Sequence, residues 1–121
     1  MAETKRLICR SEDVLERGRG QRFTMDTPQG PVPAFVVRYR GKVYGYLNRC
    51  AHVWVELDWQ PGEFFDVSGL YLVCATHGAA YLPDSGKCVA GPCKGQSLKR
   101  LAFEESGGQV YLVALEETTH G

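Results

Sequence analysis

Short apolar runs rich in β-branched and aromatic residues recur along the chain, separated by polar and turn-forming residues. Turns at residues 40–42 and 106–108 each join two such runs, which is the pattern of a β-hairpin. The runs that predict strands are residues 7–9, 21–25, 34–39, 43–47, 70–73, 98–104 and 110–115. Many short strands with Gly-rich turns predict an all-β fold, either a sandwich or a small barrel of antiparallel strands.

Smaller features complete this pattern. Ser11 is a residue type that can cap a helical turn, with Glu12 and Asp13 favourably placed after it. The segment from Pro28 to Pro33 predicts a loop. We expect residues 63–65 to pair with the strand predicted at 70–73.

Two segments break the strand pattern, residues 48–60 and 75–92, and a Cys/His pair lies at the start of each. The pairs are Cys50-Ala51-His52 and Cys74-Ala75-Thr76-His77, with the 21 residues 53–73 between them. That spacer contains a predicted strand and its turn, so the chain can leave one loop, cross the sheet and return beside it. We therefore expect both pairs to converge on one site.

Two thiolates and two imidazoles suit a metal of intermediate softness. Zinc accepts such a set as a tetrahedral site, although its usual pattern pairs Cys with Cys and His with His. Mixed pairs are instead expected of a [2Fe–2S] cluster in which two histidines replace two cysteines on one iron. The alternative is that each Cys or His is a packing residue, which is common for one residue but not for four in this order.

The two segments resemble the Rieske family, and the resemblance covers nearly the whole chain. Its first box, Cys-x-His followed by Leu, corresponds to Cys50, His52 and Leu57. Its second box and third loop correspond to Cys74, His77, Gly78, Ala79, Tyr81, Asp84, Ser85, Gly86, Gly91 and Pro92.

This resemblance implies a single Rieske domain over residues 1–121. A cluster-binding subdomain of two loops, at about residues 48–95, would be inserted in a basal β domain. It further implies one [2Fe–2S] cluster per chain, held by Cys50, His52, Cys74 and His77. The residues around the cluster would be Trp54, Gly78, Ala79, Tyr81 and Pro92.

The resemblance also predicts a low reduction potential, near the bottom of the Rieske range of about −150 to +300 mV. High-potential members carry a disulfide between the loops, whose cysteines would fall at Val55 and Thr76, and a serine where this chain has Ala79. Tyr81 acts in the opposite direction if its hydroxyl donates to the Cys50 sulfur; otherwise it is a packing ring.

Trp54 stands where the family has glycine, two residues after the first histidine. The first loop is therefore expected to follow a different path, because tryptophan resists backbone shapes that glycine allows. Trp54 would then either be exposed as a docking surface or cover the cluster.

Length, charge and apolar content restrict the number of domains and the expected partners. The 121 residues fit one domain, the formal net charge is zero and no apolar stretch approaches the roughly 20 residues of a membrane span, so neither nucleic acid nor membrane is an expected partner. With no signal-like N-terminus, the expected location is the cytoplasm. The other three cysteines are Cys9, expected in the core, and Cys88 and Cys93, which are either free thiols or a local disulfide.

These features favour a soluble one-electron carrier that passes electrons from a reductase to a terminal oxygenase or other redox enzyme, and is not itself an enzyme. A catalytic oxygenase is not expected, because no residues remain for a mononuclear iron domain. Two alternatives stay open: a small non-carrier subunit of a nitrite-reductase-like enzyme, and a zinc-stabilised binding module.

Overall fold

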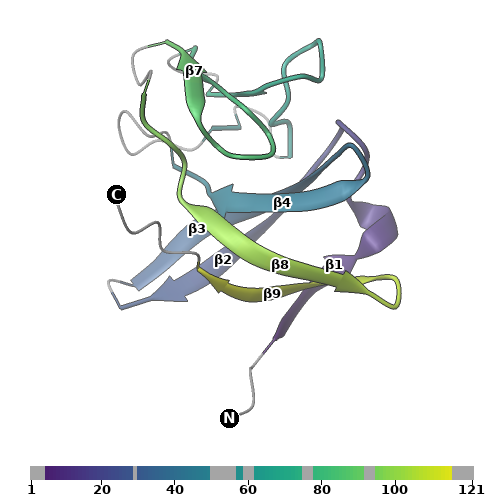
Figure 1. The fold of residues 1–121 in the computed structure, drawn as a ribbon. Helices are drawn as coiled ribbons and strands as arrows, with labels where there is room; N and C mark the ends of the chain where they lie inside the picture. The colour runs from purple at the N-terminus through teal and green to yellow at the C-terminus, as the bar shows by residue number, and fades with distance from the viewer. Residues whose placement is uncertain are drawn as a thin grey trace.

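The structure is a computed structural model, and it describes residues 5–28, 30–49, 57–58, 62–74, 78–91 and 95–115. Within these residues the chain forms two antiparallel sheets, one of six strands and one of three (Figure 1). The all-β fold predicted from the strand pattern is confirmed. Among the residues described, no helix has the length and apolar character needed to cross a membrane.

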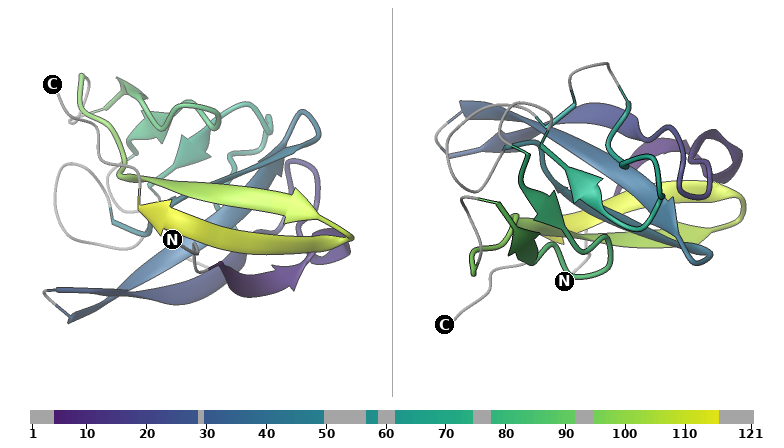
Figure 2. Two further views of the ribbon diagram at one scale, coloured as in Figure 1. Left: turned by 60° about the horizontal axis from the view of Figure 1, so that its bottom comes forward. Right: turned by 90° about the horizontal axis from the view of Figure 1, so that it is seen from above.

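The six-stranded sheet has the order β1-β9-β8-β4-β3-β2. It curls on itself, and the Arg6 guanidinium on one edge strand donates to the Thr24 carbonyl on the other at 2.6 Å, so that the sheet approaches a closed barrel (Figure 2). Apolar side chains such as Ala34, Leu101 and Val110 fill its interior. Its strands are β1 (Arg6–Arg10), β2 (Gln21–Thr27), β3 (Gly30–Tyr39), β4 (Lys42–Leu47), β8 (Arg100–Ser106) and β9 (Gln109–Leu115).

The three-stranded sheet lies between β4 and β8 in the sequence and covers one end of the larger sheet (Figure 1). Its strands are β5 (Leu72–Val73), β6 (Ala80–Tyr81) and β7 (Cys88–Ala90), in that order across the sheet. The expected pairing before β5 is confirmed, because Phe65 and Leu72 form an antiparallel bridge. Strands β6 and β7 were not predicted, since two or three residues are too few to show alternation.

The prediction of a loop from Pro28 to Pro33 is wrong, because β3 already begins at Gly30 and pairs with β2 through Pro31 and Pro33. β4 pairs only with the part of β3 from Ala34 onward. Both prolines therefore lie where one side of β3 is an edge, which is where a strand tolerates a residue without an N–H. The helical turn expected near Ser11 is a 3-10 helix, η1 (Ser11–Asp13), with Arg10 rather than Ser11 at its N-cap.

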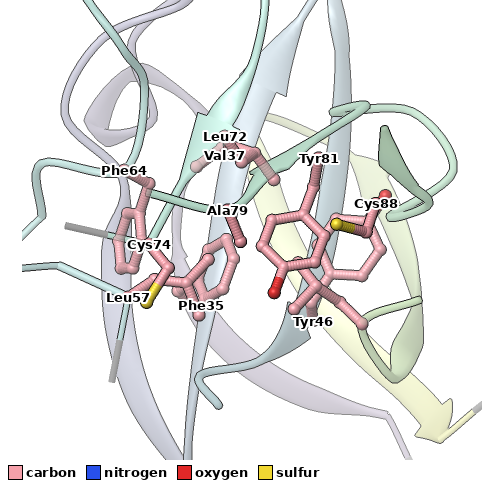
Figure 3. Close-up of a cluster of buried hydrophobic side chains, with 11 residues drawn as sticks. Phe35, Val37, Tyr46, Leu57, Phe64, Leu72, Cys74, Ala79, Tyr81 and Cys88 are labelled. Atoms are coloured by element: carbon pink, nitrogen blue, oxygen red, sulfur yellow. The ribbon is translucent and has the colours of Figure 1, made fainter. Parts of the chain in front are cut away.

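One buried apolar cluster joins the two sheets (Figure 3). The six-stranded sheet contributes Phe35, Val37 and Tyr46, and the rings of Phe35 and Phe64 stack with centroids 3.9 Å apart. The other members come from the region above: Leu57, Phe64, Leu72, Cys74, Ala79, Tyr81, Cys88 and Leu98. Because this cluster is shared, the smaller sheet has no separate core of its own among the described residues.

Candidate metal centre

The second Cys/His segment begins where β5 ends. Cys74 is fully buried, its backbone N–H donates to the Ala79 carbonyl (2.8 Å), and its own carbonyl accepts from the Gly78 N–H (2.7 Å). Gly78 has φ +72°, a left-handed conformation in which glycine is unstrained, and an added Cβ would meet nothing within 4 Å. These two bonds join the described residues on either side of residues 75–77. Those three residues, His77 among them, lie outside the described residues.

A hydrogen bond of Asn48 likewise joins the described residues before and after the first Cys/His pair. The Asn48 side-chain Oδ1 accepts from the Leu57 backbone N–H at 2.8 Å, and both residues are fully buried. Residues 50–56, with Cys50, His52 and Trp54, lie outside the described residues. The position of these three side chains therefore stays a prediction.

The described ends of the two segments meet in the interior. Leu57 follows the first Cys/His pair, Cys74 opens the second and Ala79 follows it, and all three belong to the same buried cluster (Figure 3). Residues far apart in the sequence are thus brought together at one end of the six-stranded sheet. This is the arrangement that two ligand loops sharing one centre require.

A third segment, which begins at the end of β7 with Ala90 and Gly91, packs directly on the residues that follow the second Cys/His pair. Gly91 has φ +97°, and a Cβ there would lie 2.7 Å from the Ala79 Cα atom, so only glycine allows this approach. The neighbouring strands pair, with Ala80 opposite Ala90. Pro92 and Cys93 follow immediately in the sequence but lie outside the described residues.

Two tyrosines line the interior beside these segments. Tyr81 is fully buried in the shared cluster, as a packing ring would be, while the proposed contact of its hydroxyl with Cys50 stays a prediction. Tyr46 donates its hydroxyl proton to the Pro83 carbonyl at 2.7 Å and so ties β4 to the turn before β7. The thiol of Cys88 lies 3.2 Å from the Ala90 carbonyl oxygen.

The sequence patterns did not identify Asn48, Asp58 or Tyr46 as residues that shape this region. Asn48 and Asp58 are the two buried polar residues of the described chain. Their only signal in the sequence is position, since they bracket the first Cys/His pair. Tyr46 sits in a predicted strand, where an aromatic residue needs no further explanation.

Outside this region, burial raises the pKa of the Cys9 thiol to about 11, with Asp13 adding to the shift. Cys9 is half-buried on β1, and its thiol is protonated at neutral pH.

The residues present fit an iron–sulfur centre. The described residues alone contain no group of three or more side chains able to hold a metal ion, because three of the four expected ligands are outside them. Cys74, the one expected ligand among the described residues, lies in an apolar, water-excluding cluster rather than among competing polar groups. Soft sulfur donors in such surroundings favour an iron–sulfur cluster over a hydrated metal ion.

The fold is an antiparallel β protein in which the described ends of the two Cys/His segments meet beside its main sheet. The family model of the Rieske [2Fe-2S] domain matches residues 4–112. The chain therefore belongs to the Rieske [2Fe–2S] domain family, whose domain binds a [2Fe–2S] cluster.

Solved structures with the same fold include a whole ferredoxin and part of a terminal oxygenase. The ferredoxin of carbazole 1,9a-dioxygenase from Nocardioides aromaticivorans IC177 is 19% identical, with TM-score 0.70 over 92% of this chain and 98% of its own. The terminal oxygenase of the same organism's carbazole 1,9a-dioxygenase is 21% identical, with TM-score 0.76 over 98% of this chain but 32% of its own.

A third match is a chain from a complex of reduced oxygenase and oxidized ferredoxin in carbazole 1,9a-dioxygenase. It is 22% identical, with TM-score 0.74 over 96% of this chain and 98% of its own. A comparison with curated protein sequences finds no match.

Proposed function

We propose that the protein is a one-electron carrier whose [2Fe–2S] cluster is held by Cys50, His52, Cys74 and His77. The observation that carries this proposal is the convergence of Leu57, Cys74 and Ala79, the described ends of the two Cys/His segments, in one buried cluster. Residues 48–95 would then act as a cluster-binding subdomain supported by the six-stranded sheet.

The bound cluster would accept and release one electron. The chain would hold the cluster rigidly and exclude water from it. Cys74 is held by backbone hydrogen bonds with Ala79 and Gly78, so little rearrangement is expected when the charge of the centre changes. The apolar side chains of Leu57 and Ala79 exclude water beside it. A dry, rigid environment limits reorganisation, which favours rapid electron transfer.

We further propose a low reduction potential. Ala79 is fully buried next to Cys74 and brings no hydroxyl that could stabilise the reduced centre. Val55 and Thr76 cannot form the disulfide between the loops that high-potential members carry. A midpoint potential well above zero, measured by protein-film voltammetry, would contradict this part of the proposal.

The proposed partners are a reductase and a terminal oxygenase or other redox enzyme, in the cytoplasm. The solved structures that support this include a complex of an oxygenase with a ferredoxin. The ferredoxin among these structures matches over 98% of its own length, which supports the carrier proposal.

The test is the spectroscopy of the purified protein. We expect iron and acid-labile sulfide in equal amounts, an EPR signal after dithionite reduction, and nitrogen couplings from two imidazoles in pulsed EPR. His52→Ala and His77→Ala should each remove the coupling of one imidazole or prevent cluster binding altogether. A colourless protein with one zinc per chain would refute the proposal in favour of the zinc-stabilised module.

Carrier activity needs a second measurement. The dithionite-reduced protein should transfer one electron per chain to a terminal oxygenase. The loss of its EPR signal in freeze-quenched samples measures this transfer. Co-purification with a sirohaem enzyme and no such transfer would instead support the non-carrier subunit.

A further inference from the structure

Asn48 and Asp58 lie at the two ends of the first Cys/His segment, and their side chains are joined inside the protein. The Asn48 amide donates from Nδ2 to Asp58 Oδ1 at 3.0 Å, while its Oδ1 accepts from the Leu57 N–H at 2.8 Å. Asn48 is fully buried and Asp58 is 8% exposed. The chain therefore enters and leaves the segment with Cys50 and His52 at one hydrogen-bonded junction.

The same junction is anchored to the six-stranded sheet. The second carboxylate oxygen of Asp58 accepts from the Gly62 N–H at 2.9 Å and lies 3.2 Å from the Arg22 Nε atom. Arg22 belongs to β2, which pairs with β3 along its whole length. We call Asn48, Asp58 and Arg22 the loop clamp.

A contribution to stability does not by itself explain why these polar side chains are buried. Burying a carboxylate carries a desolvation penalty, and a buried ion pair is often no more stabilising than apolar side chains of the same volume. What a fully satisfied polar network does provide is a defined geometry. Apolar side chains at positions 48 and 58 would fill the space without fixing the distance between the two ends of the segment.

We infer that the loop clamp is a positioning device for the cluster: by fixing both ends of the first segment, Asn48 and Asp58 set the geometry in which Cys50 and His52 bind iron. This inference rests on the proposed function. Asn48 and Asp58 are positioning residues, because they act through the ligands and not on the cluster itself.

The test exchanges the two side chains. N48D places two carboxylates against each other across the 3.0 Å contact, and D58N turns an amide N–H toward another donor, either Asn48 Nδ2 or the Gly62 N–H. The double variant N48D/D58N restores the hydrogen bond between positions 48 and 58 and keeps an acceptor for the Leu57 and Gly62 N–H groups, but it moves the carboxylate charge away from Arg22 to position 48. D66N is the matched control, because Asp66 also accepts from a glycine N–H, that of Gly69, but in a turn without ligands.

Each purified variant is compared with the wild type by EPR of the dithionite-reduced protein, by the rate of iron release to a chelator and by thermal melting. Both single variants should shift the EPR g-values and release iron about tenfold faster, since a buried hydrogen-bond conflict opposes the ligating geometry. The double variant should regain the wild-type spectrum and a release rate within about twofold of wild type. The control variant D66N should keep the wild-type EPR spectrum and the wild-type rate of iron release.

Other results overturn the inference in distinguishable ways. If the single variants melt earlier but keep the wild-type spectrum and release rate, the clamp is only structural. If the double variant keeps the altered spectrum, the pairing of Asn48 with Asp58 does not position the ligands. If N48D does not fold, the isosteric D58N carries the test alone. If the wild type itself gives no reduced-cluster signal, the proposed function fails and the inference with it.

Discussion

The six-stranded sheet and the three-stranded sheet differ in how their structure is maintained. Strands of the larger sheet have 5 to 10 residues, and continuous ladders join β2 to β3 and β3 to β4. Strands of the smaller sheet have 2 or 3 residues, and its connections contain left-handed glycines such as Gly78, Gly86 and Gly91. Ladder hydrogen bonds are thus plentiful in one region and few in the other.

The comparison shows where the candidate site depends on tertiary contacts. The smaller sheet is supported by the shared apolar cluster and by single polar contacts to the larger sheet, such as that of Tyr46 with Pro83. Segments with few ladder bonds can adopt the irregular shapes that metal ligation requires. We expect such a region to need its cluster for stability, whereas the larger sheet does not.

The largest effect should follow from removing a ligand. Cys74→Ser should abolish cluster binding, so that iron falls to a background level, because an alcohol is a poor replacement for thiolate. Hydrogen exchange should then accelerate at least about tenfold for amides of β5 to β7 and change little in β3 and β4.

Cys9→Ser is the control for this variant, since Cys9 lies on β1 and its thiol is protonated at neutral pH. It should keep full iron content. Equal acceleration of exchange in both sheets of Cys74→Ser would show that the two regions unfold as one unit.

Gly91→Ala should cause the next largest effect, a loss of about 2–4 kcal/mol in the free energy of unfolding, because overpacking against the Ala79 backbone adds to a left-handed conformation. Gly95→Ala is a matched control, since Gly95 has φ +95° but an added Cβ would meet nothing within 4 Å. It should cost only about 1 kcal/mol. Urea unfolding of both variants measures the difference, and equal losses would refute the close approach of the third segment to the second.

Tyr46→Phe should destabilise the protein by about 1–2 kcal/mol, because the Pro83 carbonyl loses its buried donor. Tyr111→Phe removes a hydroxyl that donates to Gln109 within β9, in a part-buried position, and should cost less than about 0.5 kcal/mol. Thermal melting of the two variants decides whether this contact joins the sheets. A smaller loss for Tyr46→Phe than for Tyr111→Phe would contradict that role.

The smallest effect concerns the larger sheet alone. Arg38 donates to both carboxylate oxygens of Glu105, at 3.1 and 2.7 Å, and this pairing lowers the pKa of Glu105 below its ordinary value of 4.5. A lowered folded-state pKa stabilises the protein above the unfolded pKa and loses that effect as the pH falls through the folded value. Glu105→Gln should therefore cost about 0.5–1 kcal/mol at pH 7, with solvent screening limiting the effect.

This difference from wild type should shrink as the pH falls below 4.5, the ordinary value of the Glu105 pKa. Denaturation at a series of pH values measures it. Glu104→Gln is the control, because Glu104 pairs with Lys5 in a more exposed position. A constant difference between wild type and Glu105→Gln down to pH 2 would show that the carboxylate charge does not matter.

Much of the larger sheet could be predicted from the sequence, since its strands are long enough for apolar and β-branched patterns to show. The exception is the start of β3, where Pro31 and Pro33 indicated a loop. Proline is compatible with a strand segment where no ladder bond needs its N–H, and only the end of β4 at Leu47 shows that the start of β3 is such a segment. The smaller sheet was largely missed because its strands are too short for periodicity.

The sequence by itself determined the residue types and order of the expected ligands, because coordination chemistry depends on which atoms are available and on how the chain spaces them. The tertiary structure decided which partners hold the ligand segments: Asn48 with Asp58, Gly91 against Ala79, and Tyr46 with Pro83. These pairs are 10 to 37 residues apart. No local pattern encodes such contacts, because they exist only once the sheets have brought distant backbone segments to the same place.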